Sequence, residues 1–137
     1  MGNNAYLRPT LHLTLYKAAL TGDWESATRV FEQNPKAATA MIMGSMYALH
    51  VAVGARKANE FVKKLVERMS LEEVAMVNGS GATTLSIAAA IENTDAVKLL
   101  VSQFGHRETL LYLLQVTKAK VQPSPYEKLL VFFFYVN

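Results

Sequence analysis

Cysteine is absent from this chain of 137 residues. Its absence excludes disulfide bonds, cysteine-ligated zinc and a thiol nucleophile, and it fits a reducing cytoplasm. Long apolar runs are scarce too: the longest, Leu129 to Val136, has eight residues, whereas a membrane-spanning helix needs about twenty. The first fifteen residues also lack the basic start and apolar stretch of a secretory signal. We therefore expect a cytoplasmic protein that reaches the cytoplasmic face of a membrane only through relatives or partners.

Neither basic nor acidic residues are in large excess: 14 basic residues and 11 acidic ones give a formal net charge of +3. A nucleic-acid-binding protein carries a concentrated basic stripe, so no nucleic-acid partner is expected. One basic cluster lies in the middle of the chain and consists of Arg56, Lys57, Lys63, Lys64 and Arg68. Glu60 and Glu67 lie within the same segment and offset part of its positive charge. We interpret this cluster as a solvated outer face. The alternative interpretation is a surface for an acidic protein or an anionic membrane.

The sequence does contain a repeat. The segments 15–22, 49–56 and 85–92 align with one another at offsets of 34 and 36 residues. An apolar stretch with spacings of three and four follows each segment, which predicts a helix pair in every unit. Alanine recurs in the first helix, where it lets two helix backbones approach closely, and Trp24 and Tyr16 are predicted to pack against the next unit. Turn-forming residues separate the units: Asn34-Pro35, Gly44-Ser45 and Asn78-Gly79-Ser80-Gly81.

Several residues in the second and third units match one repeat signature, in which Asp or Asn and a glycine three residues later precede Thr-Pro-Leu-His-x-Ala-Ala. The matches are Leu49, His50 and Ala52, then Asn78, Gly81, Thr83, Leu85, Ala88 and Ala89. By these residues the chain resembles an ankyrin-repeat array. It departs from the signature by Tyr47 in place of Thr, Ser86 in place of His, Arg56 and Glu92 in place of the inter-helix glycine, and Gly44 one residue too early. These departures predict a degenerate array of modest stability.

The first unit is similar to the first repeat of plant ankyrin-repeat membrane proteins of the accelerated-cell-death type, through Leu15-Tyr16-Lys17-Ala18-Ala19 and Gly22-Asp23-Trp24-Glu25. Those proteins act in defence and stress signalling and join a cytoplasmic ankyrin array to a membrane domain, of which this sequence shows no counterpart. The resemblance implies an all-α fold, a short ankyrin-repeat α-solenoid of helix-turn-helix units joined by β-turn loops. The expected organisation is an N-terminal segment 1–12, degenerate repeats over 13–117 (about three units and a partial fourth), a linker 118–126 and an apolar tail 127–137.

Binding rather than catalysis is the predicted function. Ser80 lies between two glycines but lacks the G-x-S-x-G spacing of a hydrolase. No histidine has a second histidine three or four residues away, as metal ligation on a helix requires, so neither a metal nor a cofactor is expected. His50 is explained instead by its ankyrin position, where this histidine hydrogen-bonds the backbone of a neighbouring turn. Ser70 and Glu73 are predicted to form a capping box.

Ankyrin proteins contact their partners through turn tips and through variable positions of the first helix, on the concave face. The equivalent residues here are Met43, Ser45, Met46 and Tyr47, then Gly79, Ser80 and Ala82, and on the helices Lys17, Thr21, Val51 and Ala55. Met46 and Tyr47 are expected to be exposed. An alternative function stays open: a truncated regulatory fragment that associates with full-length ankyrin relatives, or with itself, through its apolar C-terminal end.

Overall fold

The regular secondary structure of the described part of the chain is helical. The computed structural model describes residues 9–103, and within this range no strand forms, only an isolated bridge between Met43 and Met46. Residues 94–103 are helical. The preceding helices are α1 (Pro9–Thr21), α2 (Trp24–Gln33), the 3-10 helix η1 (Ala37–Thr39), α3 (Ala48–Ala55), α4 (Asn59–Glu67), α5 (Leu71–Val74) and α6 (Thr84–Ala90). The predicted all-α class is confirmed.

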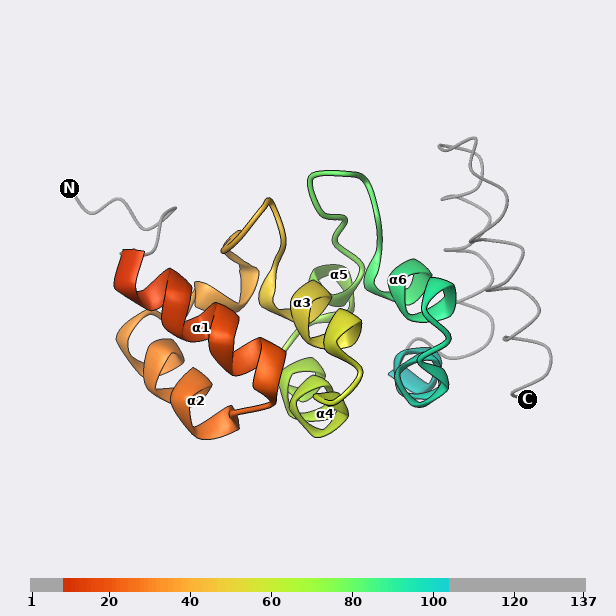
Figure 1. Cartoon of the computed structure of the whole chain (residues 1–137), viewed down its shortest axis with the longest axis horizontal. Coiled ribbons are helices and arrows are strands. Elements are labelled where there is room, and N and C mark those ends of the chain that lie inside the picture. Colours follow the sequence, from red (N-terminus) through yellow and green to blue (C-terminus); the bar gives the residue numbers. More distant parts are fainter. Residues whose placement is uncertain (1–8, 104–137) are drawn as a thin grey trace. The chain divides into compact units, whose positions relative to one another are not determined.

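The chain divides into two compact units, Met1–Thr84 and Leu85–Asn137. In the first unit, α1 packs against both α2 and α3, and α3 packs against α4. Figure 1 shows α1 and α3 side by side, with α2 and α4 below them. The predicted linker 118–126 and tail 127–137 lie outside the described residues, as does the C-terminal end of the repeat region.

Alanine explains the close packing of the first helices. Ala18, Ala19 and Ala52 are at most 2% exposed, and their small side chains let the helix backbones approach one another. Larger side chains fill the space that remains; those of Leu15, Leu49, Phe61 and Leu65 are fully buried. Burying one such side chain stabilises the fold by about 1.5–3 kcal/mol.

Two of the helix pairs, α1 with α2 in the first compact unit and α6 with helix 94–103, have the same hydrogen bonds at the connection between their helices. The connection between α3 and α4 has no side-chain cap. In the first unit the Asp23 N–H donates to the Ala18 carbonyl (2.9 Å), and the Asp23 carboxylate accepts from the Ser26 N–H (3.1 Å). In the second unit the Asn93 N–H donates to the Ala88 carbonyl (2.8 Å), and the Asn93 side-chain oxygen accepts from the Ala96 N–H (3.3 Å). Both side chains thus cap the second helix of their pair.

A residue with a left-handed backbone lies between the two helices of each pair. Gly22, Arg56 and Glu92 have φ values of 79°, 66° and 60°, and these are the three residues that the sequence alignment places in one slot. Glycine adopts this conformation freely, whereas a residue with a Cβ atom does so at a cost of about 1–2 kcal/mol. The two non-glycine residues are therefore local sources of strain.

Trp24 joins the two helix pairs of the first unit. Its ring meets the Phe61 ring of α4 edge-on at a centroid distance of 5.3 Å and lies 6.0 Å from Phe31 of its own helix. The predicted packing of Trp24 against the next unit is confirmed, although its side chain is only half-buried. The Arg68 guanidinium lies 5.0 Å from the centroid of the Phe31 ring. The predicted capping box between Ser70 and Glu73 is also present at the start of α5.

Candidate functional site

Two hairpin-like turns project from the side of the first unit that α1 and α3 form, and we call them finger 1 (residues 41–47) and finger 2 (residues 77–83) (Figure 1). Finger 1 is closed by a hydrogen bond from the Ile42 N–H to the Met46 carbonyl (2.8 Å). The corresponding bond of finger 2 runs from Asn78 to Ala82 (2.9 Å). Asn78 and Ala82 each lie 36 residues after their counterparts Ile42 and Met46, which is the offset of the sequence repeat.

The tip of finger 1 is a tight reversal. Gly44 and Ser45 both have positive φ values, 56° and 64°, and the Met46 N–H donates to the Met43 carbonyl (2.9 Å). This combination is typical of a type I′ turn. Ser45 holds the position that Gly81 (φ 81°) holds in finger 2, so a serine adopts the left-handed conformation of the signature glycine.

Two hydrogen bonds tie the fingers together, and a third ties α3 to finger 2. The Gly79 N–H donates to the Ser45 carbonyl (3.0 Å), and the Asn78 amide donates to the Met46 sulfur (3.0 Å). The His50 Nε2 atom lies 3.1 Å from the Ala82 carbonyl oxygen, which confirms the predicted bond between His50 and a neighbouring turn. The Asn78 side-chain oxygen also accepts bonds from the backbone of its own finger, at Ser80 and Ala82. The fingers therefore form one braced platform.

His50 makes its bond as a neutral imidazole. The ring is 2% exposed, and this burial lowers the pKa of His50 from its ordinary value of 6.5, although the carbonyls of Ala82 and Met76 favour the charged form. A carbonyl oxygen only accepts hydrogen bonds, so the proton of the neutral ring lies on Nε2. The Nδ1 atom is buried without a well-formed hydrogen bond.

The predicted contact residues fall into three groups. The exposed ones are Lys17, Thr21, Met43, Ser45, Gly79 and Ser80, and the half-buried ones are Met46, Tyr47, Ala55 and Ala82. Met46 and Tyr47 were expected to be exposed, but Met46 bonds to Asn78 and the Tyr47 ring lies 5.6 Å from the His50 ring. Val51 is 6% exposed. The helix α3 packs against both α1 and α4, and every one of its residues from 48 to 53 is buried. The Val51 side chain is not available to a partner.

Two exposed apolar residues at this site were not predicted. Met41 is 44% exposed and Val77 is 47% exposed. They occupy equivalent positions in the two fingers, since they are separated by the repeat offset of 36 residues. The repeat offset could have identified this pair from the sequence. The ankyrin signature does not include them, because both residues precede its turn positions.

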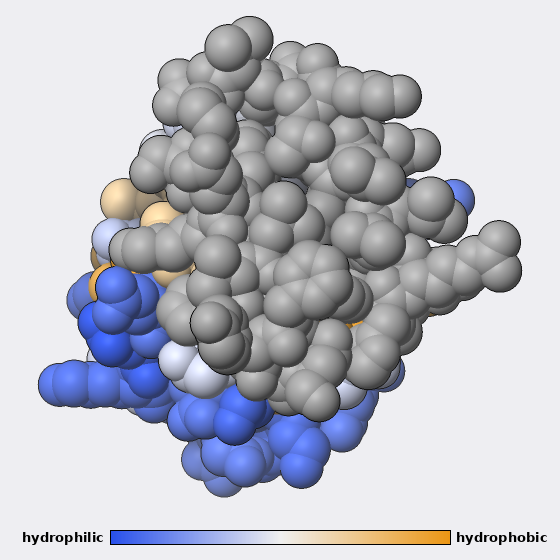
Figure 2. Space-filling model, turned by 90° about the vertical axis from the view of Figure 1, so that its right-hand side faces the viewer, coloured by the Kyte–Doolittle hydropathy of each residue, from blue (hydrophilic) through white to orange (hydrophobic). Residues whose placement is uncertain are grey.

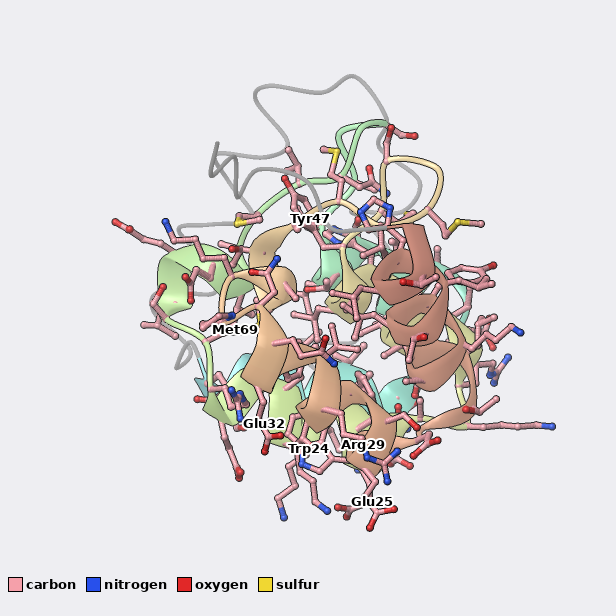
Figure 3. All side chains as sticks on the ribbon, turned by 90° about the vertical axis from the view of Figure 1, so that its left-hand side faces the viewer. Trp24, Glu25, Arg29, Glu32, Tyr47 and Met69 are labelled. Carbon is pink, nitrogen blue, oxygen red and sulfur yellow. The ribbon has the colours of Figure 1, made fainter. Side chains whose placement is uncertain are left out.

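The two fingers and the segments that flank them lack charge. Asp, Glu, Lys and Arg do not occur between residues 37 and 55 or between 74 and 84. Charged side chains lie instead on the outer helices, as Figure 3 shows for Glu25, Arg29 and Glu32 at the end of the molecule opposite Tyr47. In the view of Figure 2, hydrophilic residues gather along the lower part of the surface. The fingers therefore present an uncharged surface.

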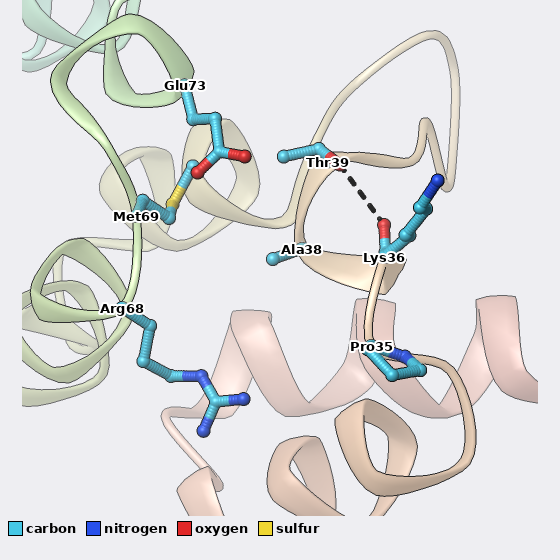
Figure 4. Close-up of a pocket in the computed structure, with 7 residues that line it drawn as sticks. All are labelled: Pro35, Lys36, Ala38, Thr39, Arg68, Met69 and Glu73. Atoms are coloured by element: carbon cyan, nitrogen blue, oxygen red, sulfur yellow. Dashed lines mark hydrogen bonds between the residues drawn. The ribbon is translucent and has the colours of Figure 1, made fainter.

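A small polar pocket lies away from the fingers, between η1 and the start of α5 (Figure 4). Its volume is about 140 Å³, and it is lined by Pro35, Lys36, Ala38, Thr39, Arg68, Met69 and Glu73. Small-molecule sites usually measure about 300–1,000 Å³. Two of its polar side chains already have partners: Thr39 donates to the Lys36 carbonyl (3.3 Å), and Glu73 accepts from the Ser70 N–H. The pocket does not indicate a ligand.

Comparison with protein-family models, curated proteins and solved structures found no match to this chain. Among the described residues, no cluster of three or more His, Asp or Glu side chains is placed to hold a metal ion. No helix in the same part of the chain is long and apolar enough to span a membrane. The fingers are therefore the candidate functional site, and the predicted docking through the C-terminal end lies outside the described residues.

Proposed function

We propose that this protein is an ankyrin-type interaction module that binds a cytoplasmic protein partner through its two fingers and the accessible side of α1. The observation that carries the proposal is the pair of cross-braced fingers with equivalent hydrogen bonds at the repeat offset, Ile42 to Met46 and Asn78 to Ala82. The left-handed residues at Gly22, Arg56 and Glu92 support the same repeat.

A rigid platform with accessible apolar side chains suits binding. The backbone bond between Gly79 and Ser45 and the bond between His50 and Ala82 fix the fingers before a partner arrives. Little conformational entropy is then lost on association, which raises affinity. Exposed Met43 supplies a flexible thioether side chain, which adapts to varied apolar surfaces.

A role in plant stress or defence signalling belongs to this proposal through the resemblance of the first unit alone. The residues concerned, 15–25, form the end of α1 and the start of α2. They suggest the biological setting of the partner, whereas the fingers suggest how it is bound.

Affinity capture with matched variants tests the proposed function. The wild-type chain, Met43→Arg and Gln33→Arg are immobilised in equal amounts, and retained proteins from a plant cell extract are quantified by mass spectrometry. Met43 and Gln33 are both exposed, so each change adds one positive charge at the surface, but only Met43 lies on a finger. We expect proteins that wild type and Gln33→Arg retain to be lost with Met43→Arg. Equal retention by all three chains, or no specific retention by any, contradicts the proposal.

A further inference from the structure

We propose that Asn78 is a site of spontaneous deamidation, and that the opening of finger 2 sets the rate of this reaction. Asn78 is the one asparagine of the sequence that is followed by glycine. Each group that takes part in the reaction is held by a hydrogen bond in the folded protein. Water is the only co-reactant. The products are aspartate and isoaspartate at position 78, and the isoaspartate product separates the two fingers.

The reaction takes place within the Asn78-Gly79 dipeptide. The Gly79 nitrogen attacks the side-chain carbonyl carbon (Cγ) of Asn78, and the new N–C bond closes a succinimide ring. The side-chain nitrogen leaves as ammonia, which takes up the proton that Gly79 gives up. Water then opens the ring at one of its two carbonyl carbons, where the carbon gains the hydroxyl group and the nitrogen gains the hydrogen. Opening at one carbon yields aspartate, and opening at the other yields isoaspartate.

Glycine at position 79 makes Asn78 more reactive than the other asparagines. Glycine has no Cβ atom beside the attacking nitrogen, and its backbone reaches conformations that other residues rarely adopt. Asn34 precedes proline, which has no N–H proton to give up. Asn59 and Asn93 precede residues whose side chains crowd the attacking nitrogen. These two asparagines therefore serve as internal controls.

The hydrogen bonds of finger 2 oppose the attack in the folded protein. The Gly79 N–H donates to the Ser45 carbonyl (3.0 Å), and a hydrogen-bonded backbone N–H gives up its proton only when the bond opens. The Asn78 side-chain oxygen accepts from two N–H groups of its own finger (2.9 and 3.0 Å), and the leaving nitrogen donates to the Met46 sulfur (3.0 Å). Asn78 is 8% exposed. The reaction therefore requires finger 2 to open first.

His50 controls this opening without touching the reacting groups. Its Nε2 atom lies 3.1 Å from the carbonyl oxygen of Ala82, and the same carbonyl accepts the closing bond of finger 2 from the Asn78 N–H (2.9 Å). Loss of the imidazole loosens finger 2 and leaves the Asn78-Gly79 dipeptide intact. Local opening is fast compared with a change of covalent structure. The rate in the folded chain is thus proportional to the population of the open form.

The two products affect finger 2 differently. Aspartate keeps side-chain oxygens that accept from the backbone of the finger, and it loses only the N–H that donates to the Met46 sulfur. Isoaspartate carries the main chain through its Cβ atom, which adds a methylene group between the α-carbon of residue 78 and the Gly79 nitrogen. The closing bond of finger 2 and the bond from Gly79 to Ser45 then no longer form together. Finger 2 separates from finger 1 once isoaspartate has formed.

Incubation of the full chain in mildly alkaline buffer, followed by proteolysis and mass spectrometry of the peptide that contains Asn78, tests the inference. Ion fragmentation distinguishes isoaspartate from aspartate. We expect conversion at Asn78 and much slower conversion at Asn59 and Asn93. Conversion at Asn78 should be at least about tenfold faster when the chain is unfolded in urea, which corresponds to an opening free energy of about 1.4 kcal/mol.

Matched variants identify the opening that limits the reaction. In the folded chain His50→Ala should raise the rate at Asn78 about fivefold, the factor that corresponds to about 1 kcal/mol for one hydrogen bond. His50→Gln retains a donor and should raise the rate less. Trp24→Ala is the control, because it removes a contact between α2 and α4 at the end of the molecule opposite Tyr47 (Figure 3). It should leave the rate unchanged.

The results can contradict each step. Absence of conversion at Asn78 in urea overturns the site, and equal rates in the folded and unfolded chains overturn its control by finger 2. Acceleration by Trp24→Ala as large as that by His50→Ala would mean that global unfolding limits the reaction, and this also overturns the inference.

The aged chain tests the effect of the product. The purified isoaspartate form should melt at a lower temperature than Asn78→Asp, and its Gly79 N–H should lose protection from hydrogen exchange. Equal melting temperatures together with a protected Gly79 N–H would show that the fingers stay joined, which overturns their separation by isoaspartate.

Discussion

The Gly79 N–H donates a hydrogen bond to the Ser45 carbonyl oxygen at 3.0 Å, and the same approach brings the Ser45 side chain against the α-carbon of Gly79. A Cβ atom at position 79 would lie 2.9 Å from the Ser45 Oγ atom and closer still to its Cβ. Successive fingers are thus joined at a point where one residue must lack a side chain.

Gly79→Ala should therefore destabilise the protein by about 1–3 kcal/mol, the usual cost of overpacking. The Ser45→Gly variant removes the atoms that the new Cβ would meet, so the double variant should recover most of the loss. Urea denaturation of the four chains gives the coupling free energy of the cycle. Additive effects of the two changes would mean that the fingers do not touch at this point.

His50 gives a pH-dependent contribution to stability. Because burial holds the folded pKa below the ordinary value of 6.5, the unfolded state takes up a proton first as the pH falls. The contribution is complete above pH 6.5 and is lost progressively as the pH decreases towards the folded pKa. We expect the unfolding free energy of wild type to decrease on acidification through this range, and His50→Gln to reduce that decrease.

The hydrogen bond of His50 has a separate effect at neutral pH. His50→Ala leaves the Ala82 carbonyl without its partner, so it should lower stability by about 1–3 kcal/mol at pH 7.5. His50→Gln retains an amide donor and should lose less. If both variants matched wild type in thermal unfolding, the bond between α3 and finger 2 would contribute nothing to stability.

Arg56 offers a stabilising substitution. Its φ of 66° is favourable only for glycine, so Arg56→Gly should raise the unfolding free energy by about 1 kcal/mol after the greater flexibility of unfolded glycine is taken into account. Arg56→Ala is the control, because alanine keeps the strained conformation while also removing the charge. A gain with alanine as large as that with glycine would show that charge, and not backbone strain, is responsible.

The helix pairs were predictable from the sequence because alanine and the three-four spacing report local packing. The aligned repeats also place two further features at equivalent positions. These are the helix caps at Asp23 and Asn93 and the left-handed residues Gly22, Arg56 and Glu92. These features depend on residues close together in the chain.

The accessibility of the candidate site was less predictable, because it depends on how neighbouring elements pack. Val51 holds a position that is variable in the repeat, yet α3 lies between α1 and α4, which leaves this side chain buried. Met46 lies in a turn, but the Asn78 amide of the next finger reaches its sulfur. The exposure of Met41 is likewise a property of the folded finger.

Trp24 should be required for the stability of the first unit as a whole. Its ring lies edge-on to Phe61 of the next helix pair at 5.3 Å, so Trp24→Ala removes both apolar area and an aromatic pair. Truncation of a buried aromatic residue costs about 3–5 kcal/mol, and the half-exposed position of Trp24 reduces the expected loss to about 2 kcal/mol. Circular dichroism during thermal unfolding measures this loss of stability, with Glu25→Ala on the exposed face of α2 as the neighbouring control.

Because Phe61 belongs to α4, the double variant Trp24→Ala/Phe61→Leu should lose less stability than the sum of the two single changes. Strict additivity would place the effect of Trp24 within α2 alone, and the two helix pairs would then owe their association to the contacts between α1 and α3.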